Sequence, residues 1–485
     1  MMKRFILTLA ILISSCAPRS TPSPLTTVTP PARAAPSPSF GATPLPTRAR
    51  WNFGDVLPYT VQPGDTLVAV AARFNTPSDA IQQFNPEIKF ADLTTLEPKT
   101  QLKIPANYAP FNGTPFWIIP DSELINSPGV KDFLTKKFIL EQKGFLTTYD
   151  DYADQKMRPT WEVIDRVAQI YSINPRLLIA LVEYRSGAVT QKNISDFTYP
   201  LGYRQPTYGG LHNQLIWAAK QMSRGYYGWK SGKILEVTFS DGRVQRLDFW
   251  QNAGTAALHS LFAEMMTQEE FNRAVSPDGF SATYKKLFGD PFRHEVSLMP
   301  TNLRQPNLLL PFKKDTIWSY TGAPHAVWGD DTPWAAIDFA PPTVGIGCGF
   351  SNDWATALAD GVITRSDEST VMLDLDGDGD ERTGWVIFYF HLRSDEMASV
   401  GQKLKAGDPV GHPSCEGGRA TGTNVHIARK YNGEWITADS IIPFVMSGWR
   451  TRSSGREYFG SLTFDFPALK IEACECVSQG NQIKH

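Results

Sequence analysis

The chain of 485 residues is longer than one ordinary domain, so we expect two to four domains. Its 47 basic and 49 acidic residues give a net charge of −2, and no basic stripe appears along the sequence. This balance argues against nucleic acid as a partner. The hydrophobic fraction of 42% is enough to build several sizeable cores.

The first 16 residues have the pattern of an export signal. Lys3 and Arg4 precede an apolar run over residues 5–13, which is too short to span a bilayer. The run ends in small residues before Cys16, and the stretch ISSC resembles the lipobox of bacterial lipoproteins, where the cysteine is lipidated. We therefore expect a lipid anchor at Cys16. The alternative is an ordinary signal peptide with a chance cysteine.

Residues 17–50 are rich in proline, threonine, serine and alanine. Such a stretch cannot bury apolar surface and stays extended. We expect it to hold the folded part of the protein away from a membrane surface.

Residues 51–108 alternate between strand and helix signals. The stretch YTVQ alternates like a strand, PGDT caps a helix, a second short helix stops at NP, and TQLKIP closes as a strand. This start and finish resemble the LysM module, a β-α-α-β domain that binds glycans containing N-acetylglucosamine. The resemblance implies that the glycan lies beside Gly64, Asp65, Thr66 and Leu67 and beside Asn85, Pro86 and Glu87. The alternative for Asp65 and Asn85 is that they only cap and turn.

Residues 110–311 are predicted to be mainly helical. Ile164, Val167 and Tyr171 follow helical spacing, and Asn174 is placed to cap the next helix. The stretch NPRLLIALVEYRSG resembles the start of lysozyme-like lytic transglycosylases, which implies that Glu183 acts as a general acid. The sequence departs from that family because two residues separate Glu183 from the following serine. A non-catalytic lysozyme-like domain is the alternative.

Residues 312–450 contain short strands separated by glycine and proline turns, which predicts a β domain, and we expect 451–485 to be a C-terminal tail. Four pieces occur in the order found in lysostaphin/LytM-type zinc metallopeptidases, which cleave peptide cross-links in peptidoglycan. They are PHAVWGDDTPWAAIDFAPP, ATALADGVIT, WVIFYFHL and GDPVGHPSCEGGRATGTNVHIAR. The resemblance implies that His325, Asp338 and His426 bind zinc, while His391 assists proton transfer or steadies the oxyanion.

The residue types fit that chemistry. A catalytic zinc keeps three protein ligands of the imidazole and carboxylate kind and leaves one position for water. The metal lowers the pKa of this water and polarises the scissile carbonyl.

Two features depart from the family. Twelve residues separate His325 from Asp338, and this insert offers Asp330 and Asp331 as rival ligands. Asn424 stands where the family has a second catalytic histidine, and an amide cannot accept a proton at neutral pH. The sequence therefore leaves two alternatives open, a working peptidase and a module that binds wall peptides without cutting them.

The stretch DLDGDGDERTG, residues 374–384, joins two predicted strands. Alternating aspartates resemble a calcium loop, and Asp374, Asp376, Asp378 and Asp380 offer oxygen ligands. The twelfth position of an EF-hand register would be Trp385, so the loop is not an EF-hand. The alternative to calcium is a solvated acidic turn.

Four cysteines remain after Cys16, and they allow three disulfide pairings. Cys474 and Cys476 are too close in sequence to pair comfortably with each other. Cys348 and Cys415 are the other two.

The sequence as a whole predicts an exported, lipid-anchored envelope protein with three modules. These are a β-α-α-β LysM module, a mainly α lysozyme-like middle domain and an all-β lysostaphin-like domain. We expect a zinc peptidase that hydrolyses peptidoglycan cross-links, with zinc as its cofactor and calcium as a second candidate. Its partners would be wall glycan, stem peptides and, through the lipid, a membrane. The rival functions are a non-catalytic wall-binding protein and a glycosidase acting through Glu183.

Overall fold

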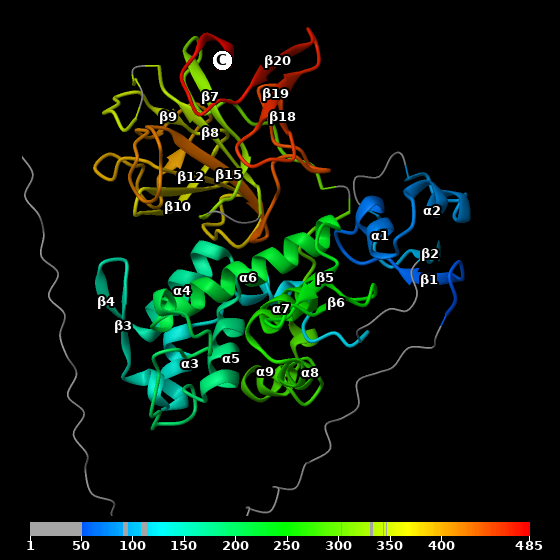
Figure 1. The fold of residues 1–485 in the computed structure, drawn as a ribbon. Coiled ribbons are helices and arrows are strands. Elements are labelled where there is room, and N and C mark those ends of the chain that lie inside the picture. The colour runs from blue at the N-terminus through cyan, green and yellow to red at the C-terminus, as the bar shows by residue number, and fades with distance from the viewer. Residues whose placement is uncertain are drawn as a thin grey trace, which may run out of the picture. The chain divides into compact units, whose positions relative to one another are not determined.

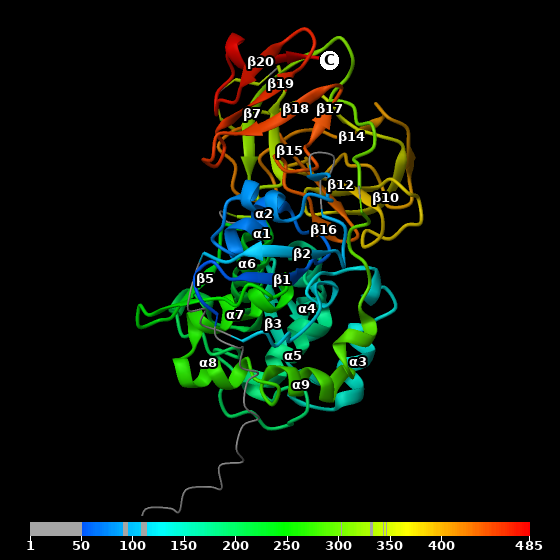
Figure 2. The same ribbon diagram turned by 90° about the vertical axis from the view of Figure 1, so that its right-hand side faces the viewer.

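The computed structural model describes residues 51–90, 96–107, 114–301, 303–329, 333–342, 344–345 and 347–485. The predicted signal with Cys16, the linker over 17–50, and Asp330 and Asp331 lie outside the described residues. Figures 1 and 2 follow the chain from the blue N-terminal module through the cyan and green helices to the yellow and red strands. In the described part of the chain, every helix is too short or too polar to cross a membrane.

The N-terminal module has the predicted β-α-α-β order. Strands β1 (Val56–Thr60) and β2 (Gln101–Pro105) pair antiparallel, and helices α1 (Leu67–Arg73) and α2 (Ser78–Phe84) lie between them in sequence. Thr66 caps α1, because its side chain accepts a hydrogen bond from the Ala69 amide at 3.1 Å. The LysM architecture expected for this segment is confirmed.

The middle part is mainly helical, as predicted. Asn174 caps its helix by accepting from the Arg176 amide at 2.9 Å. The helices are α3 (Thr135–Gln142), α4 (Thr160–Tyr171), α5 (Pro175–Ser186), α6 (Leu211–Ser231), α7 (Ala253–Met265), α8 (Gln268–Ala274) and α9 (Phe280–Phe288). Two hairpins accompany them, β3 (Asp150–Ala153) with β4 (Lys156–Pro159) and β5 (Glu236–Thr238) with β6 (Val244–Arg246).

The C-terminal part is all β, as predicted, and is built on an antiparallel sheet of the order β13-β10-β11-β12-β15-β8-β7-β21, with β16 paired to β15. Its strands are β7 (Ile317–His325), β8 (Ala336–Ala340), β10 (Gly361–Asp367), β11 (Thr370–Asp374), β12 (Trp385–Phe390), β13 (Lys403–Leu404), β15 (Val425–Tyr431), β16 (Glu434–Trp435) and β21 (Gln482–Lys484). A second sheet holds β17 (Val445–Met446), β18 (Trp449–Ser453), β19 (Gly460–Phe464) and β20 (Leu469–Glu472), and a small one pairs β14 (Pro409–Gly411) with β9 (Ala355–Thr356).

The two faces of the large sheet belong to two different cores. Side chains alternate along a strand, so residues two apart share a face. In β12, Ile387 and Tyr389 join the core of the β part, whereas Phe388 and Phe390 join the core that contains the helices. In β15, Ala428 lies on the helical side and Ile427 on the other. The helical part therefore covers one face of the sheet.

The segment expected to be a tail is part of the β structure. Residues 449–472 form β18, β19 and β20, and β21 pairs with β7 through the register Ile483↔Trp318. Charged residues and turns punctuate this region, so its short strands gave no long apolar period. The extra pairing completes the edge of the large sheet beside β7.

Two disulfides join the four described cysteines. Cys348 pairs with Cys415 across 67 residues, and Cys474 pairs with Cys476. The expectation that Cys474 and Cys476 do not pair with each other is wrong. The turn that separates β20 from β21 brings their Cα atoms to 5.0 Å, within the range that a disulfide spans.

Candidate metal centre

Three strands bring the predicted ligands together. His325 ends β7, Asp338 lies in the middle of β8, and His426 is the second residue of β15. The β15–β8 register pairs His426 with Asp338. By alternation, both side chains lie on the face of Ala336 and Ala428, which is the face covered by the helical part.

The donor atoms form a nearly equilateral triangle. His325 Nε2 lies 3.0 Å from His426 Nδ1 and 3.3 Å from Asp338 Oδ1. His426 Nδ1 lies 3.1 Å from Asp338 Oδ1. In a tetrahedral zinc site the donor atoms are about 3.3–3.4 Å apart, as follows from bonds of about 2.0–2.1 Å. Three donors of the right chemistry at this spacing fit a zinc ion.

The surroundings of the triangle support this fit. His325 Nδ1 lies 2.8 Å from the carbonyl of Ala323, which fixes the proton on Nδ1 and turns the Nε2 lone pair towards the other donors. Asp338 Oδ1 is buried and lacks a hydrogen bond of good geometry among the described residues, despite its short distances to the two imidazoles. A cation would satisfy this oxygen.

The ionisation of the site suits a metal. Burial lowers the pKa of His426 to about 4, so this imidazole is neutral at pH 7, as a ligand must be. Burial opposes the ionisation of Asp338, but His325 and His426 outweigh it and hold the pKa of this carboxyl well below its usual range. Asp338 therefore supplies a charged oxygen ligand.

Gly322 is a supporting residue that the sequence reasoning missed. It faces Asp338 across the β7–β8 pair, and a Cβ atom placed on it would lie 2.4 Å from Asp338 Oδ2. Any larger residue would push the carboxylate away from the histidines. A lone glycine in a strand pattern indicates such a close approach in general, but it does not tell which side chain approaches.

His391 lies at the end of β12 with a left-handed backbone, at φ 58°. Non-glycine residues seldom adopt this conformation, which is often found at functional sites. Its Nδ1 lies 2.8 Å from the Glu416 carbonyl, which leaves Nε2 free of a proton, and its ring centroid is 5.9 Å from that of His426. Burial lowers its pKa, so the ring is a neutral base at pH 7.

Asn424 lies two residues before His426, on the same side of the strand. Its Nδ2 donates to the Gly422 carbonyl at 2.8 Å, while its Oδ1 is buried and has no hydrogen-bond partner among the residues described. Asn424 therefore carries an acceptor oxygen that has no partner among the described residues.

Tyr458 is a second residue that the sequence reasoning missed, because it lies in the segment expected to be a tail. Its ring stacks on His325 with centroids 4.2 Å apart and planes at 18°. Burial, together with the nearby Asp338 carboxylate, raises the pKa of its hydroxyl, which stays protonated at pH 7. Tyr458 thus fixes one face of a ligand ring and brings a hydroxyl donor near the centre.

The ligands and His391 are largely enclosed in this structure. His325 is 1% exposed, His391 and His426 are each 5% exposed, and the Asp338 side chain is 13% exposed. The rings of Phe388 and Phe390 lie 5.8 Å and 5.9 Å from that of His426.

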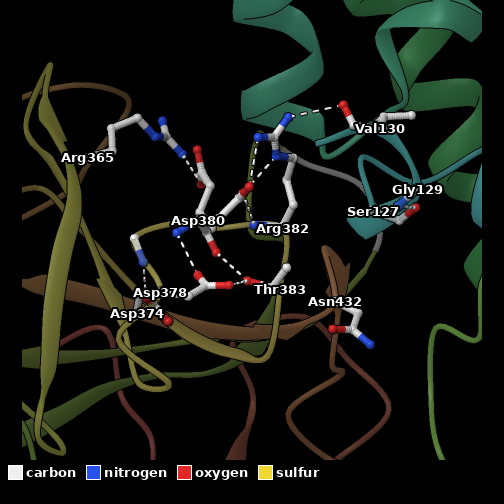
Figure 3. A network of polar contacts seen from close by, with 12 residues as sticks. Ser127, Gly129, Val130, Arg365, Asp374, Asp378, Asp380, Arg382, Thr383 and Asn432 are labelled. Carbon is white, nitrogen blue, oxygen red and sulfur yellow. Dashed lines mark hydrogen bonds and ion pairs between the residues drawn. The ribbon is translucent and has the colours of Figure 1, made fainter. Parts of the chain in front are cut away.

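The acidic loop forms the second cluster. Asp374, Asp376 and Asp378 each place one carboxylate oxygen within 4.8 Å of the others. Asp380 is not part of this group, because its two oxygens bind Arg382 at 2.7 and 2.8 Å (Figure 3). The Asp374 oxygens also accept from the amides of Asp376 and Gly379. Burial, with the Asp376 charge, raises the pKa of Asp374 to about 6.

The polar residues of the N-terminal module divide into two kinds. The Asp65 carboxylate is buried, accepts from the Tyr59 hydroxyl at 2.5 Å and pairs with Arg73 at 2.7 Å. The Asn85 amide is buried and bonds to Ile81 and Lys103. These bonds hold the module together, as the alternative reading of Asp65 and Asn85 expects. Gly64 and Thr66 are half-buried at the surface.

Glu183 lies at the end of α5, as predicted, but both its oxygens are engaged locally. Oε2 accepts from the amides of Val189 and Thr190 at 3.0 and 3.1 Å, and Oε1 accepts from the Thr190 hydroxyl at 2.5 Å. These bonds fix the turn after the helix. The geometry favours a structural role and gives no support to glycan cleavage by Glu183.

The molecule thus combines a LysM-like module and a helical layer with an antiparallel sheet that carries a two-histidine, one-carboxylate centre. Residues 59–105 match the family described as LysM domain, and residues 117–302 match LasA, N-terminal domain. The helical part is therefore similar to that domain, whereas the sequence had suggested a lysozyme-like one.

Two relatives are similar over more than half of this chain. Both are called Protease LasA, from Pseudomonas aeruginosa strains UCBPP-PA14 and PAO1, and they are 24% and 25% identical over 306 and 304 residues. Each alignment covers 58% of this chain and 68% of the relative.

Two solved structures match parts of the chain. The M23 metalloprotease pseudoalterin is 22% identical over 36% of this chain and 99% of its own, with a TM-score of 0.30. The catalytic domain of lysostaphin from Staphylococcus simulans is 20% identical over 26% of this chain and 89% of its own, with a TM-score of 0.18.

Proposed function

We propose that this protein is a zinc-dependent peptidase that hydrolyses peptide bonds of peptidoglycan. The observation that carries the proposal is the triangle of His325 Nε2, Asp338 Oδ1 and His426 Nδ1, whose edges of 3.0–3.3 Å match a zinc site. The similarity to Protease LasA supports peptide hydrolysis as the reaction. A bound zinc would supply an acidified water and polarise the scissile carbonyl.

The side chains around the triangle have distinct roles in this proposal. His391 presents a neutral Nε2 and accepts the proton that the attacking water loses. Tyr458, protonated at pH 7, donates a hydrogen bond to the developing oxyanion. Asn424 orients the water through its unpartnered Oδ1 but cannot take a proton. The acid–base pair of the resembled family is thus reduced to one histidine.

Asn424 also supports a second candidate function. If one histidine is not enough, the module binds wall peptides without cutting them. Both candidate functions require that a wall peptide bind at the metal face of the sheet. Only the peptidase would release cleavage products.

The N-terminal module extends the proposal to glycan. The LysM match supports binding of peptidoglycan glycan, with Gly64, Thr66 and the turn around them as the contact edge. Such a protein works outside the cytosol, and the signal-like first 16 residues support export. We propose that lipidation at Cys16 then anchors it to the envelope, which a Cys16→Ala variant found in the soluble fraction would support.

A metal assay combined with wall digestion tests the peptidase. We expect zinc in the purified protein and new free amines after incubation with sacculi, and Asp338→Ala should lose both. Zinc without new amines, but with retained wall binding, would support the second candidate. Protein that neither holds zinc nor cuts would contradict both.

We further propose that the acidic loop binds calcium through Asp374, Asp376 and Asp378. The four-aspartate set predicted from the sequence is reduced to three in this proposal, because Asp380 is bound to Arg382.

A further inference from the structure

The metal-bearing face of the sheet is closed by the helical part. Phe388, Phe390 and Ala428, which share that face with His426, belong to the same hydrophobic core as helices α4 to α7. The ligand histidines are at most 5% exposed. Because the helical part packs on the face that carries His426, we take this arrangement as a closed state, in which a wall peptide has less access to the ligands than after the two parts separate.

A turn of the β part anchors the closed state. It covers residues 432–435, which are the two residues that connect β15 to β16 together with β16 itself, and we call it the 432–435 turn. The Ser172 hydroxyl donates to the Gly433 carbonyl at 2.5 Å, the Trp435 amide donates to the Tyr227 hydroxyl at 3.0 Å, and Asn432 donates to the Leu298 carbonyl at 2.9 Å. Each of these partners lies in the helical part or in the segment that follows it.

The acidic loop adds a second anchor. Arg382 pairs with Asp380 and donates to the Val130 carbonyl at 3.3 Å, as Figure 3 shows. The hairpin turn carrying Asn432 lies beside it in the same view.

Lys230 of α6 links this anchor to the N-terminal module. Its ammonium lies 2.5 Å from Glu434 Oε1, whose side chain is 2% exposed. On the other side, a Cβ atom placed on Gly64 would lie 2.8 Å from the same ammonium nitrogen. The first turn of the LysM module, helix α6 and the 432–435 turn therefore meet at one charged group.

Residues beside the first turn bind the helical part in the closed state. Gln62 Nε2 donates to the carbonyls of Trp250 and Gln251 at 3.1 and 3.2 Å. Behind it, Arg73 donates to the Trp229 carbonyl at 3.3 Å, and Phe249 of the helical part belongs to the core of the LysM module. The module is thus packed on the helical part along the edge where the glycan is proposed to bind.

We propose that glycan binding at the first turn of the LysM module and closure over the metal face exclude each other, and that Lys230 couples the two. The inference rests on the proposed function, in which this turn binds wall glycan. A sugar on the turn takes the space that Lys230 and the Trp250–Gln251 backbone occupy when the turn is docked. Glycan therefore binds the open state better and shifts the population towards it. The wall itself would then expose the peptidase centre.

Linkage makes the coupling testable without measuring hydrolysis. If glycan binds the open state better, any change that raises the open population must strengthen glycan binding. Gly433→Ala is such a change, because its Cβ would lie 2.1 Å from the Asn126 carbonyl oxygen of the helical part. Gly401→Ala is the matched control, since Gly401 has a similar φ of 82° against 80° and no described atom near its Cβ position.

The experiment measures the affinity of the full chain for soluble N-acetylglucosamine oligomers by calorimetry. We expect Gly433→Ala to bind about tenfold more tightly than the wild type, within the usual range of coupling between sites. Gly401→Ala should bind like the wild type. Saturating oligomer should also speed amide hydrogen exchange over residues 431–435 in the wild type.

A second pair of variants keeps the test independent of the glycine position. Lys230→Met leaves Glu434 buried without a countercharge in the closed state, so it should also strengthen glycan binding. Lys137→Met is its control, because this lysine on α3 is 70% exposed and pairs only with exposed Glu141. Equal affinities of wild type, Gly433→Ala and Lys230→Met would overturn the coupling and leave the proposed function standing. No oligomer binding by any variant would overturn the coupling together with the glycan part of that function.

Discussion

The β part contains two clusters of potential metal ligands that differ in construction. The ligands of the histidine centre come from β7, β8 and β15, and up to 101 residues separate them in sequence. The acidic loop draws its three aspartates from five consecutive residues. In the first cluster, Asp338 Oδ1 is buried without a hydrogen bond. In the second, Asp374 already accepts hydrogen bonds from two amides of its own turn.

The difference teaches how strongly each cluster demands a metal. Burying a carboxylate oxygen without a well-formed hydrogen bond is costly, so a bound cation would add to the stabilisation that the two imidazoles give Asp338. The loop satisfies its own carboxylates and stays half in solvent, so it is stable with or without a cation. We therefore expect tight zinc binding at the first cluster and weak calcium binding at the second.

The largest effect is expected from losing one zinc ligand. Asp338→Ala or His426→Ala leaves two donors, and we expect the content to fall from about one zinc per chain to nearly none. Inductively coupled plasma mass spectrometry of dialysed protein measures it. Asp376→Ala is the control that should keep its zinc. Zinc retained in both ligand variants would place the metal elsewhere.

Asn424→His tests the missing half of the acid–base pair. A histidine at this position could accept a proton, and general acid–base assistance commonly contributes about 10²–10⁴ in rate. We expect faster release of amines from sacculi and unchanged zinc content. Brisk cutting by the wild type with no gain in the variant would mean that His391 alone suffices.

Gly322→Ala tests how far the first centre is preorganised. The added Cβ would collide with Asp338 Oδ2 and displace the carboxylate, although all three ligand residues are still present. Disturbing a supporting residue of this kind typically costs about 10–100-fold in metal affinity. Competition with a chelator measures the change, and an unaltered zinc affinity would refute the supporting role.

A smaller effect is expected at the acidic loop. Millimolar calcium should raise the melting temperature of the zinc-loaded wild type by about 2–4 °C, which corresponds to about 1 kcal/mol in a chain of this kind. Asp378→Asn should remove the shift. If calcium has the same effect on both proteins, the loop is a solvated turn.

The acidic loop also predicts a pH dependence. The Glu381 side chain is 13% exposed; burial opposes its ionisation, but Arg365 and Lys430 outweigh the burial and lower its pKa to about 2 from 4.5. Because the folded pKa lies below the ordinary value, its stabilisation is complete above about pH 4.5 and is lost as pH falls towards 2. The contribution is on the order of 3 kcal/mol. We expect the free energy of unfolding, measured with urea, to fall more steeply between pH 4.5 and 2 in the wild type than in Glu381→Gln.

Local sequence signals were sufficient for the three parts of the fold. Asn174 and Thr66 each cap a helix at a position where the sequence predicted a cap. Because side chains alternate along a strand, His426 and Asn424 lie on one face. The metal set followed from the order of motifs along the chain. What could not be predicted depends on contacts between distant residues. The carboxylate beside Gly322 comes from another strand, and Tyr458 reaches His325 from 133 residues further along the chain.

Asp65 and Glu183 show why the role of a polar residue is hard to predict from sequence. The sequence assigns Asp65 to a glycan site and Glu183 to acid catalysis, but a sequence does not tell how many hydrogen bonds a carboxylate already accepts. Asp65 is held by Tyr59 and Arg73, and Glu183 is held by the turn that follows its helix. These bonds within the fold depend on the packing of distant residues, which the sequence does not show.

The Cys348–Cys415 disulfide has a consequence for when the protein matures. It ties the loop after β8 to the segment before β15, and Gly347 in that loop accepts from the Thr423 amide directly beside Asn424. Thiols stay reduced in the bacterial cytosol and oxidise beyond it. In a newly made chain, the two segments beside the proposed metal ligands would therefore stay unlinked until the chain has left the compartment where it was synthesised. Under the proposed function, the cell that makes the protein would be spared a finished peptidase inside its own cytosol, and recombinant material would need an oxidising host compartment.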